Sequence, residues 1–348
     1  MNLDSLQERK ESVLSSVIHH YVATAKPVGS QVIAEEMDLS SATIRNILME
    51  LEGDGYLTHP HTSAGRIPVD QGYRFYVDKL MLARQLNLKE KHMVEQEYEK
   101  AKDEVEMLMR HTAKILSAVT NLAGLAMFHI PEEVSLSHFR LVTLDSRKVM
   151  VILVLEHGLV KEELVRMDGP VQLKEITKII QLLNSRFSGW TLAEIRGSLL
   201  KEAEKVKKVR LSILETALKL IDNALNFKSE EIHMEGATHL VEQPEFKAAE
   251  KMERVVRLIE QKQPLGRVLG RQWLTPGLTV EIGHESPDAA LKDFSFVHVP
   301  CYFQGKVVGA LGVLGPTRMA YGRVTGVVRH LARHLEETLT RNGGSSIA

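Results

Sequence analysis

Residues 40–68 read SSATIRNILMELEGDGYLTHPHTSAGRIP, and their pattern is the most informative in the first part of the chain. Ser40 or Ser41 is placed to cap a helix that runs to about Asp54. The helical spacing predicts two different faces. The inward residues are Ile44, Ile47, Leu48 and Leu51, and the outward residues are Ala42, Asn46 and Met49, with Thr43 and Arg45 on the flanks.

Two helical patterns precede this helix. The first carries its apolar residues on one face, and Pro27 ends it. The second is short and covers residues 31–37, with Ser30 placed to cap its start. A compact turn at residues 38–40 joins it to the capped helix. A short helix, a tight turn and a longer helix form the outline of a helix-turn-helix motif.

A turn-rich stretch follows the capped helix. Residues 55–58 and 67–69 are expected to pair as two short strands around a tip at residues 59–66. No acidic residue occurs between residues 55 and 69, and the tip carries hydroxyls, a glycine and Arg66. This hairpin either lies on DNA as a wing, with Arg66 in a narrow minor groove, or is a plain solvated loop.

The outward face of the capped helix has the chemistry of a major-groove reader. Asparagine can read adenine and arginine can read guanine through paired hydrogen bonds, which favours Asn46 and Arg45. Hydroxyls near the helix start, together with the free amides there, can bind phosphate. Small polar residues also occur on any exposed helix, so a plain surface helix is the alternative.

The charge of residues 1–80 opposes DNA binding through bulk electrostatics. Seven basic and eleven acidic residues leave a net charge of −4, whereas DNA-binding domains are typically basic. Binding would therefore depend on the local placement of Arg45, Arg66 and Arg74. It would also depend on two copies acting together, because one copy neutralises few phosphates.

The whole chain has an ordinary globular composition. Its 348 residues are 44% hydrophobic and 26% charged with a net charge of −1, which excludes global disorder and names no partner. The longest uncharged apolar run, residues 149–155, is far shorter than the roughly 20 residues that cross a bilayer. The polar start shows no secretory signal, and the single cysteine, Cys301, fits a reducing compartment. We therefore expect a cytoplasmic protein with no membrane contact and two or three domains.

Beyond residue 82 the pattern alternates between helices and strands. A highly charged segment at residues 88–106 leads into an apolar helix that ends near residue 122, and the seam of three- and four-residue steps predicts one long helix. This helix either packs against its own domain or forms an intermolecular coiled coil. Strands are expected at residues 136–144, 148–155, 159–165, 279–282, 294–303 and 307–314, with a tight turn at residues 304–305 and a final helix at residues 320–340.

A helical stretch at residues 171–228 separates the two groups of strands. Its last part carries two adjoining apolar stripes, one of Leu211, Leu214, Leu218, Ile221 and Leu225, and one of Ile213, Ala217, Leu220 and Ala224. Such a helix needs more partner surface than one small insertion offers. The simplest account is a helical insertion that splits an α/β domain and forms a homodimer through this helix. Burial within its own subunit is the alternative.

Several motifs together resemble one family. They are SSATIRN at residues 40–46, GYL at 55–57, PHTSAGRIP at 60–68, DQGYRFYVD at 70–78 and GVLGPTRMAYGRV at 312–324. In order and spacing they closely resemble the HrcA family, the heat-inducible transcription repressors of bacterial chaperone operons. The resemblance covers essentially the whole chain and is weakest in the insertion.

The resemblance implies an α+β multidomain protein. Its parts would be a winged helix-turn-helix DNA-binding domain at residues 1–82, a charged linker helix at 83–106, a discontinuous GAF-like α/β domain at 107–170 and 230–342, and an inserted dimerising segment at 171–229. It also implies a dimer that binds double-stranded DNA at an inverted repeat, the CIRCE element, ahead of the chaperonin and Hsp70 operons. The GroEL chaperonin would keep this repressor active until unfolded protein occupies the chaperonin.

The resemblance also assigns residues to roles. The candidates for DNA contact are Ser41, Thr43, Arg45 and Asn46 on the helix, Thr62, Ser63, Gly65 and Arg66 on the wing, and Arg74 as a phosphate clamp. Tyr73 and Tyr76 match the motif and are expected to pack in the core.

Other chemistries have little support. The pairs His59 with His61 and His330 with His334 have no third ligand placed by sequence, so no metal is expected. Cys301 lies in an apolar strand, which favours a buried inert thiol over a nucleophile. No nucleotide-binding or hydrolase motif is present, so neither an enzyme nor a cofactor is expected. The alternative function is a transcription regulator gated by a metabolite in the GAF-like domain.

Overall fold

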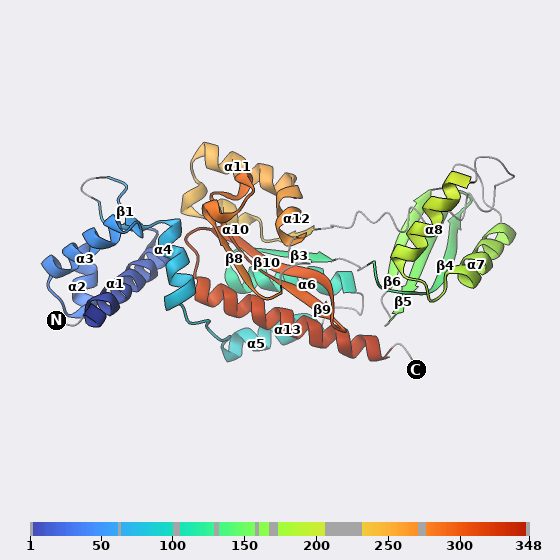
Figure 1. Ribbon diagram of the computed structural model, residues 1–348, viewed down its shortest axis with the longest axis horizontal. Coiled ribbons are helices and arrows are strands. Elements are labelled where there is room, and N and C mark those ends of the chain that lie inside the picture. The colour runs from blue at the N-terminus through green and yellow to red at the C-terminus, as the bar shows by residue number, and fades with distance from the viewer. Residues whose placement is uncertain are drawn as a thin grey trace.

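The computed structural model describes residues 3–61, 64–99, 105–128, 132–156, 160–166, 173–205, 232–270 and 276–345. These residues form an N-terminal unit, a central body and a smaller lobe, arranged along the long axis of the molecule with the body in the middle (Figure 1). Residues 206–231 lie outside the described part. The proposed dimer residues Leu211, Leu214, Leu218, Ile221 and Leu225 therefore cannot be placed.

The N-terminal unit is three helices, then a two-stranded antiparallel sheet, then a short α-helix that continues into a π-helix. Its elements are α1 (Leu3–Thr24), α2 (Ser30–Met37), α3 (Ser41–Gly53), β1 (Leu57–Thr58), β2 (Ile67–Pro68), α4 (Asp70–Phe75) and the π-helix η1 (Tyr76–Leu80). Asp38 adopts a positive φ of 51° and turns the chain between α2 and α3. The predicted cap at Ser30 is wrong, because Gly29 holds the N-cap position and the Ser30 hydroxyl contacts Ser41 instead.

The body is built on a five-stranded antiparallel sheet in the order β7-β3-β10-β9-β8. The strands are β7 (Ile232–Glu235), β3 (Ala123–Phe128), β10 (Lys306–Pro316), β9 (Phe294–Phe303) and β8 (Thr279–Ile282). The predicted bounds of β8 and β9 are confirmed. The predicted turn between β9 and β10 is confirmed as well, since Gln304 and Gly305 both have positive φ, as a type I′ turn requires.

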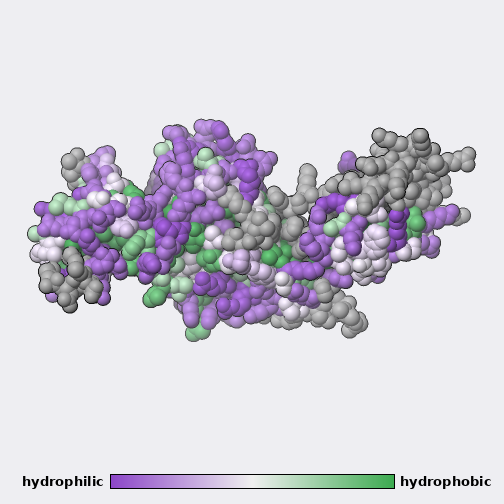
Figure 2. All heavy atoms as spheres, viewed as in Figure 1, coloured by the Kyte–Doolittle hydropathy of each residue, from purple (hydrophilic) through white to green (hydrophobic). Residues whose placement is uncertain are grey.

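Helices cover both faces of this sheet. On one face lie α5 (Leu88–Glu99), α6 (Val105–Thr120) and α13 (Tyr321–Ser345), and on the other lie α10 (Thr238–Glu242), the 3₁₀ turn η4 (Pro244–Phe246), α11 (Ala249–Glu260) and α12 (Gln263–Gly270). Alternate residues of β9 supply the two cores: Val297 and Cys301 pack toward α6 and α13, and Phe294 and Phe296 toward η4 and α11. Hydrophilic side chains cover the outer surface of α11 (Figure 2).

The charged segment does not form one long helix with the apolar segment that follows it. The Tyr98 hydroxyl on α5 lies 2.5 Å from Thr112 Oγ1 on α6. On a continuous helix these residues would be roughly 21 Å apart along the axis. The two helices therefore pack against each other, and α5 is part of the body rather than a solvated linker, since Val94 and Tyr98 are buried.

The lobe has its own three-stranded antiparallel sheet, in the order β4-β5-β6. It contains β4 (Leu136–Asp145), β5 (Lys148–Leu155), β6 (Val160–Arg166), α7 (Leu173–Phe187) and α8 (Leu192–Lys205). The predicted strands are present, but the sequence-based division at residue 170 differs from this arrangement. Of the range assigned to the GAF-like domain, β3 joins the body sheet while β4–β6 stand apart with the two helices.

Among the described residues, no helix is both long enough and apolar enough to cross a membrane.

Candidate nucleic-acid interface

Helix α3 presents a polar face to solvent, as its spacing predicts. Ile44, Ile47, Leu48 and Leu51 are buried against α1 and α2, while Ala42, Thr43, Arg45, Asn46 and Met49 are exposed. The Ser40 hydroxyl caps the helix by accepting a hydrogen bond from the Thr43 amide at 3.0 Å. The remaining amides at this end give the start of α3 a partial positive charge.

Two of the predicted hydroxyl contacts have partners inside the protein. Ser41 is half-buried, and its Oγ lies 2.9 Å from Ser30 Oγ, which ties the start of α3 to the start of α2. Thr43 Oγ1 lies 2.7 Å from Ser40 Oγ but remains exposed. Arg45 and Asn46 come shortly after Thr43 on α3, and both side chains are exposed. The face therefore offers a guanidinium, an amide and a hydroxyl beside the helix start.

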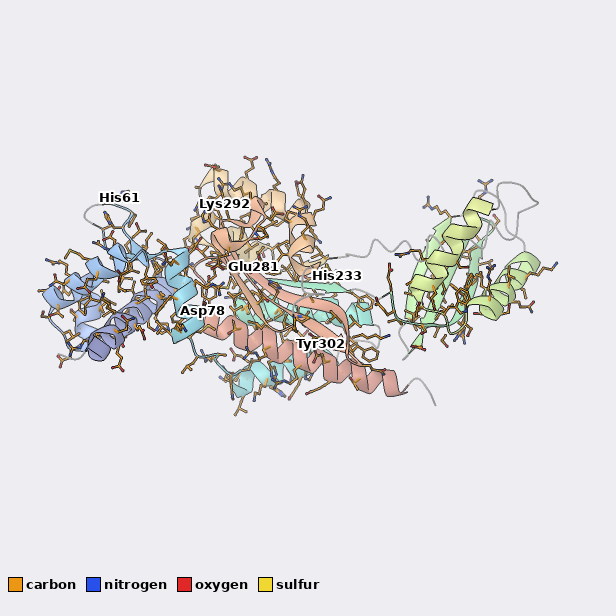
Figure 3. All side chains as sticks on the ribbon, viewed as in Figure 1. His61, Asp78, His233, Glu281, Lys292 and Tyr302 are labelled. Carbon is orange, nitrogen blue, oxygen red and sulfur yellow. The ribbon has the colours of Figure 1, made fainter. Side chains whose placement is uncertain are left out.

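The hairpin after α3 is anchored to the loop before α2. Strands β1 and β2 pair antiparallel, and the Arg66 amide and carbonyl each make a 2.9 Å hydrogen bond with Val28. Figure 3 shows His61 at the projecting tip of this hairpin. Thr62 and Ser63, the other predicted wing contacts, lie outside the described residues. Close packing against Val28 requires a glycine at position 65, because a Cβ there would lie 2.5 Å from the carbonyl of Val28. The sequence did not reveal this contact.

Replacing Gly65 by alanine is expected to destabilise the N-terminal unit by about 1–3 kcal/mol, because backbone atoms of Val28 occupy the space a Cβ needs. Native-state hydrogen exchange of the α3 amides and of the Arg66 amide, which donates to the Val28 carbonyl, measures this opening free energy. Gly53→Ala is the matched control, since nothing lies within 4 Å of a Cβ there. Equal opening free energies for the two variants would contradict the close-approach explanation.

Basic residues from other elements neutralise the acidic end of α3. Lys10 on α1 lies 2.8 Å from Glu50 and 3.5 Å from Asp54, while Arg66 lies 2.7 Å from Glu52. His59 also contacts Glu52. The three carboxylates at this end of α3 are therefore each paired with a basic side chain, although residues 1–80 keep their net charge of −4. Lys10 is 40 or more residues from its partners in the chain, so no local spacing pattern reveals these pairs.

Arg66 has a different environment from the one predicted. Its guanidinium is held by Glu52 and its side chain is mostly covered. A free minor-groove contact would have to break this ion pair. In this arrangement Arg66 positions the hairpin against α3.

Arg74, predicted from the sequence to be a phosphate clamp, is paired with carboxylates inside the protein in this structure. Arg74 on α4 makes paired hydrogen bonds to Glu285 at 2.7 and 2.5 Å, and it also binds Asp78 at 3.1 Å. Hydrogen bonds to Glu285 raise the pKa of Arg74, so the group stays charged. Its charge is used inside the molecule, where it joins the N-terminal unit to the body.

The expectation that the two motif tyrosines pack in the core is confirmed. Tyr73 and Tyr76 are buried, and burial raises the pKa of both phenols. The Tyr76 hydroxyl lies 2.9 Å from His19 Nε2 on α1, and the Tyr73 ring packs on Tyr321 of the body.

The residues set aside as chemical groups have structural environments. Cys301 is completely buried, and burial raises the pKa of its thiol well above the ordinary value. The rings of His330 and His334, both on α13, stack on each other. Burial lowers the pKa of His330, and the neighbouring charge of His334 lowers it further. Within the described ranges, no group of three or more His, Cys, Asp or Glu side chains is arranged to hold a metal ion.

Known proteins match this chain along almost its entire length. Residues 106–325 match the family described as HrcA protein C terminal domain. A heat-inducible transcription repressor HrcA from Pelotomaculum thermopropionicum is 35% identical over 97% of both chains. Another, from Brevibacillus brevis, is 36% identical over 96% of this chain and 98% of its own. A crystal structure described as that of a hypothetical protein shares the fold, with a TM-score of 0.63 at 22% identity, and the match covers 96% of this chain and 98% of the other.

A mixed α/β protein with these relatives is a transcription repressor and not an enzyme. More particularly, the chain belongs to the HrcA family of heat-inducible transcription repressors.

Proposed function

We propose that the N-terminal unit is a winged helix-turn-helix that reads an inverted-repeat operator of the CIRCE type. The exposed polar face of the capped helix α3 carries this proposal. Asn46 and Arg45 are its base readers, and Thr43 and the helix-start amides bind phosphate. Ser41 and Gly65 support the motif from within, through the contact to Ser30 and the close approach to Val28.

The protein acts as a cytoplasmic homodimer in this proposal. An inverted repeat presents two equivalent half-sites, and a twofold dimer matches this symmetry. The body with the five-stranded sheet is the GAF-like domain, and the lobe together with residues 206–231 is the dimerising part. One N-terminal unit has a net charge of −4 and therefore binds DNA weakly by itself. Two linked reading helices give the dimer a higher affinity than a single unit has.

The genes it represses are the chaperonin and Hsp70 operons. The relatives are named heat-inducible repressors. We propose that the GroEL chaperonin keeps the repressor active, and that heat shock releases the operator when unfolded protein occupies the chaperonin.

Footprinting on the chaperone promoters of the source organism tests the proposal. We expect protection of two half-sites related by a twofold axis, and stronger protection at equal protein concentration when chaperonin is present. Addition of unfolded protein should reverse the chaperonin effect. Promoters with one scrambled half-site are the control. Equal binding to intact, scrambled and unrelated DNA, with and without chaperonin, would overturn the proposal.

A further inference from the structure

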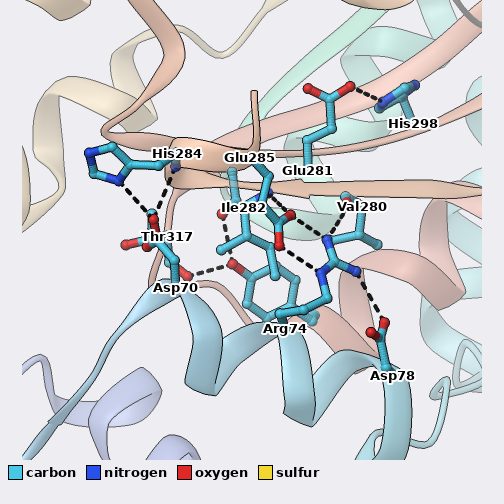
Figure 4. Close-up of polar contacts among 12 residues, drawn as sticks. Asp70, Arg74, Asp78, Val280, Glu281, Ile282, His284, Glu285, His298 and Thr317 are labelled. Atoms are coloured by element: carbon cyan, nitrogen blue, oxygen red, sulfur yellow. Dashed lines mark hydrogen bonds and ion pairs between the residues drawn. The ribbon is translucent and has the colours of Figure 1, made fainter. Parts of the chain in front are cut away.

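The N-terminal unit is attached to the body by a dense polar contact (Figure 4). Arg74 on α4 binds Glu285 through two hydrogen bonds and also donates to the carbonyl of Val280 at 2.5 Å. Glu285 in turn accepts a hydrogen bond from the Ile282 amide at 2.8 Å, so its carboxylate is fixed to the body. A bidentate arginine–carboxylate pair constrains direction as well as distance.

A second contact lies one helical turn before Arg74. Asp70 Oδ2 accepts a 3.0 Å hydrogen bond from the His284 amide and lies 2.9 Å from His284 Nδ1. The preceding residue, Gly283, has a φ of +52°, and a Cβ there would lie 2.3 Å from Asp70 Oδ2. Glycine at residue 283 therefore suits both the positive φ of the turn η6 (Gly283–Glu285) and the position of the Asp70 carboxylate beside it.

The last turn of α1 also makes a contact with the body. Arg318, in the loop after β10, donates to the carbonyl of Val22 at 2.6 Å. A cation at the carboxyl end of a helix is favoured by the helix dipole. The same guanidinium is oriented by Glu245 and by Gln243, the latter at 3.1 Å. Its side chain is only 11% exposed, so solvent screens these contacts weakly.

The connecting segment after η1 is also fixed to the body. The Arg84 amide donates to the carbonyl of Gly322 on α13 at 2.8 Å. Cβ atoms at Gly322 and Gly326 would lie 2.8 Å from the Leu82 carbonyl oxygen and 1.9 Å from the Arg84 carbonyl oxygen. The backbone of the connector thus lies directly on α13, although the Leu82 side chain points to solvent.

We infer that these contacts are a positioning junction, which fixes the reading helix α3 relative to the body and thereby sets the spacing between operator half-sites that the protein accepts. Interfaces between domains normally permit relative motion unless they are extensive. Here the unit is held at α4, at the end of α1 and at the connector, and three separate attachments restrain both tilt and rotation. Two of the motifs that resemble the HrcA family, at residues 70–78 and 312–324, contact each other at this junction through Tyr73 and Tyr321.

The inference rests on the proposed function, because spacing matters only to a dimer on an inverted repeat. Adding two base pairs between half-sites rotates one of them by about 70° around the DNA axis. A rigid dimer cannot follow this rotation without losing one half-site and its avidity. A protein with a loosened junction can follow it.

Binding to operators with different spacers tests the junction. For the native protein we expect about tenfold weaker binding when two base pairs are added or removed. For Arg74→Ala and Glu285→Ala this ratio should fall below about threefold, and the double variant should be no looser than either single variant. Arg74→Lys should lie between, since it keeps the charge but not the paired geometry. Arg257→Ala, which removes an exposed arginine paired with Glu253 on its own helix, is the control.

A phosphate contact by Arg74 would give a different result. It would weaken all spacers equally, lower the salt dependence by about one contact and leave Glu285→Ala without effect. That outcome would overturn the inference while leaving the proposed function intact.

A measurement without DNA separates the two proposals. Spin labels at Lys26→Cys on the N-terminal unit and Thr340→Cys on α13 report their separation, because both positions are exposed and Cys301 is buried. One narrow distance distribution is expected, which Arg74→Ala broadens. If native protein binds no inverted repeat but the distances behave this way, the proposed function fails and the junction stands. Equal distributions in the two proteins would overturn the junction.

Discussion

Asn46→Ala is expected to weaken binding to the inverted-repeat operator by at least about 30-fold while leaving non-specific binding within about twofold. Asn46 is exposed on the outward face of α3, close to the capped start of the helix. One paired hydrogen bond to a base contributes about 1–3 kcal/mol of discrimination, and an inverted repeat contains the contact twice. Fluorescence anisotropy on operator and on scrambled DNA of equal length measures both affinities.

The salt dependence of binding separates a base reader from a phosphate contact. Asn46→Ala should leave the slope of affinity against salt concentration unchanged, because a neutral amide releases no counterions. Arg45→Ala should also lose specific affinity in excess of non-specific affinity. Gln96→Ala removes an exposed amide from α5, in the body, and serves as the control. Losses of equal size on operator and scrambled DNA would exclude a base-reading role for Asn46.

The double variant Leu214→Asp, Leu218→Asp is expected to be monomeric and to bind the operator at least about 100-fold more weakly than the native protein. The two leucines belong to the apolar stripe at residues 211–225. In the proposed dimer seam, two carboxylates would carry a large desolvation cost, and separation of the subunits would relieve it. Sedimentation velocity measures the mass, and anisotropy measures operator binding.

A matched control uses leucines that are already in solvent. Leu82 and Leu88 are exposed, so replacing both by aspartate should leave the mass of the dimer unchanged. If Leu214→Asp, Leu218→Asp still sediments as a dimer, the dimer seam lies on another surface. A monomer that keeps full operator affinity would show instead that dimerisation is not needed for binding.

The elements that local patterns control were predicted well. The faces of α3 follow from helical spacing, because burial of one face imposes a period on the sequence. The bounds of β5, β8 and β9 follow from short runs rich in β-branched, aromatic and other apolar residues that are bounded by turn residues. The turn at Gln304 and Gly305 follows from the need for positive φ at both positions. Strand β3 was missed because its apolar residues follow the apolar helix α6 almost directly, so no change of pattern separates the two elements in the sequence.

The capped helix α3, its exposed side chains and the family could be recognised without coordinates, since all three are encoded over short stretches or in ordered motifs. The partners of the charged residues became visible only in the folded chain. Arg74 and Arg66 resemble free DNA contacts in sequence, yet Glu285 and Glu52 hold them. In the folded protein the charged segment forms a separate helix, α5, which packs against α6. Strands β4–β6 form a sheet of their own. Such outcomes depend on which distant groups the fold brings within hydrogen-bonding distance, and residue spacing carries no record of that.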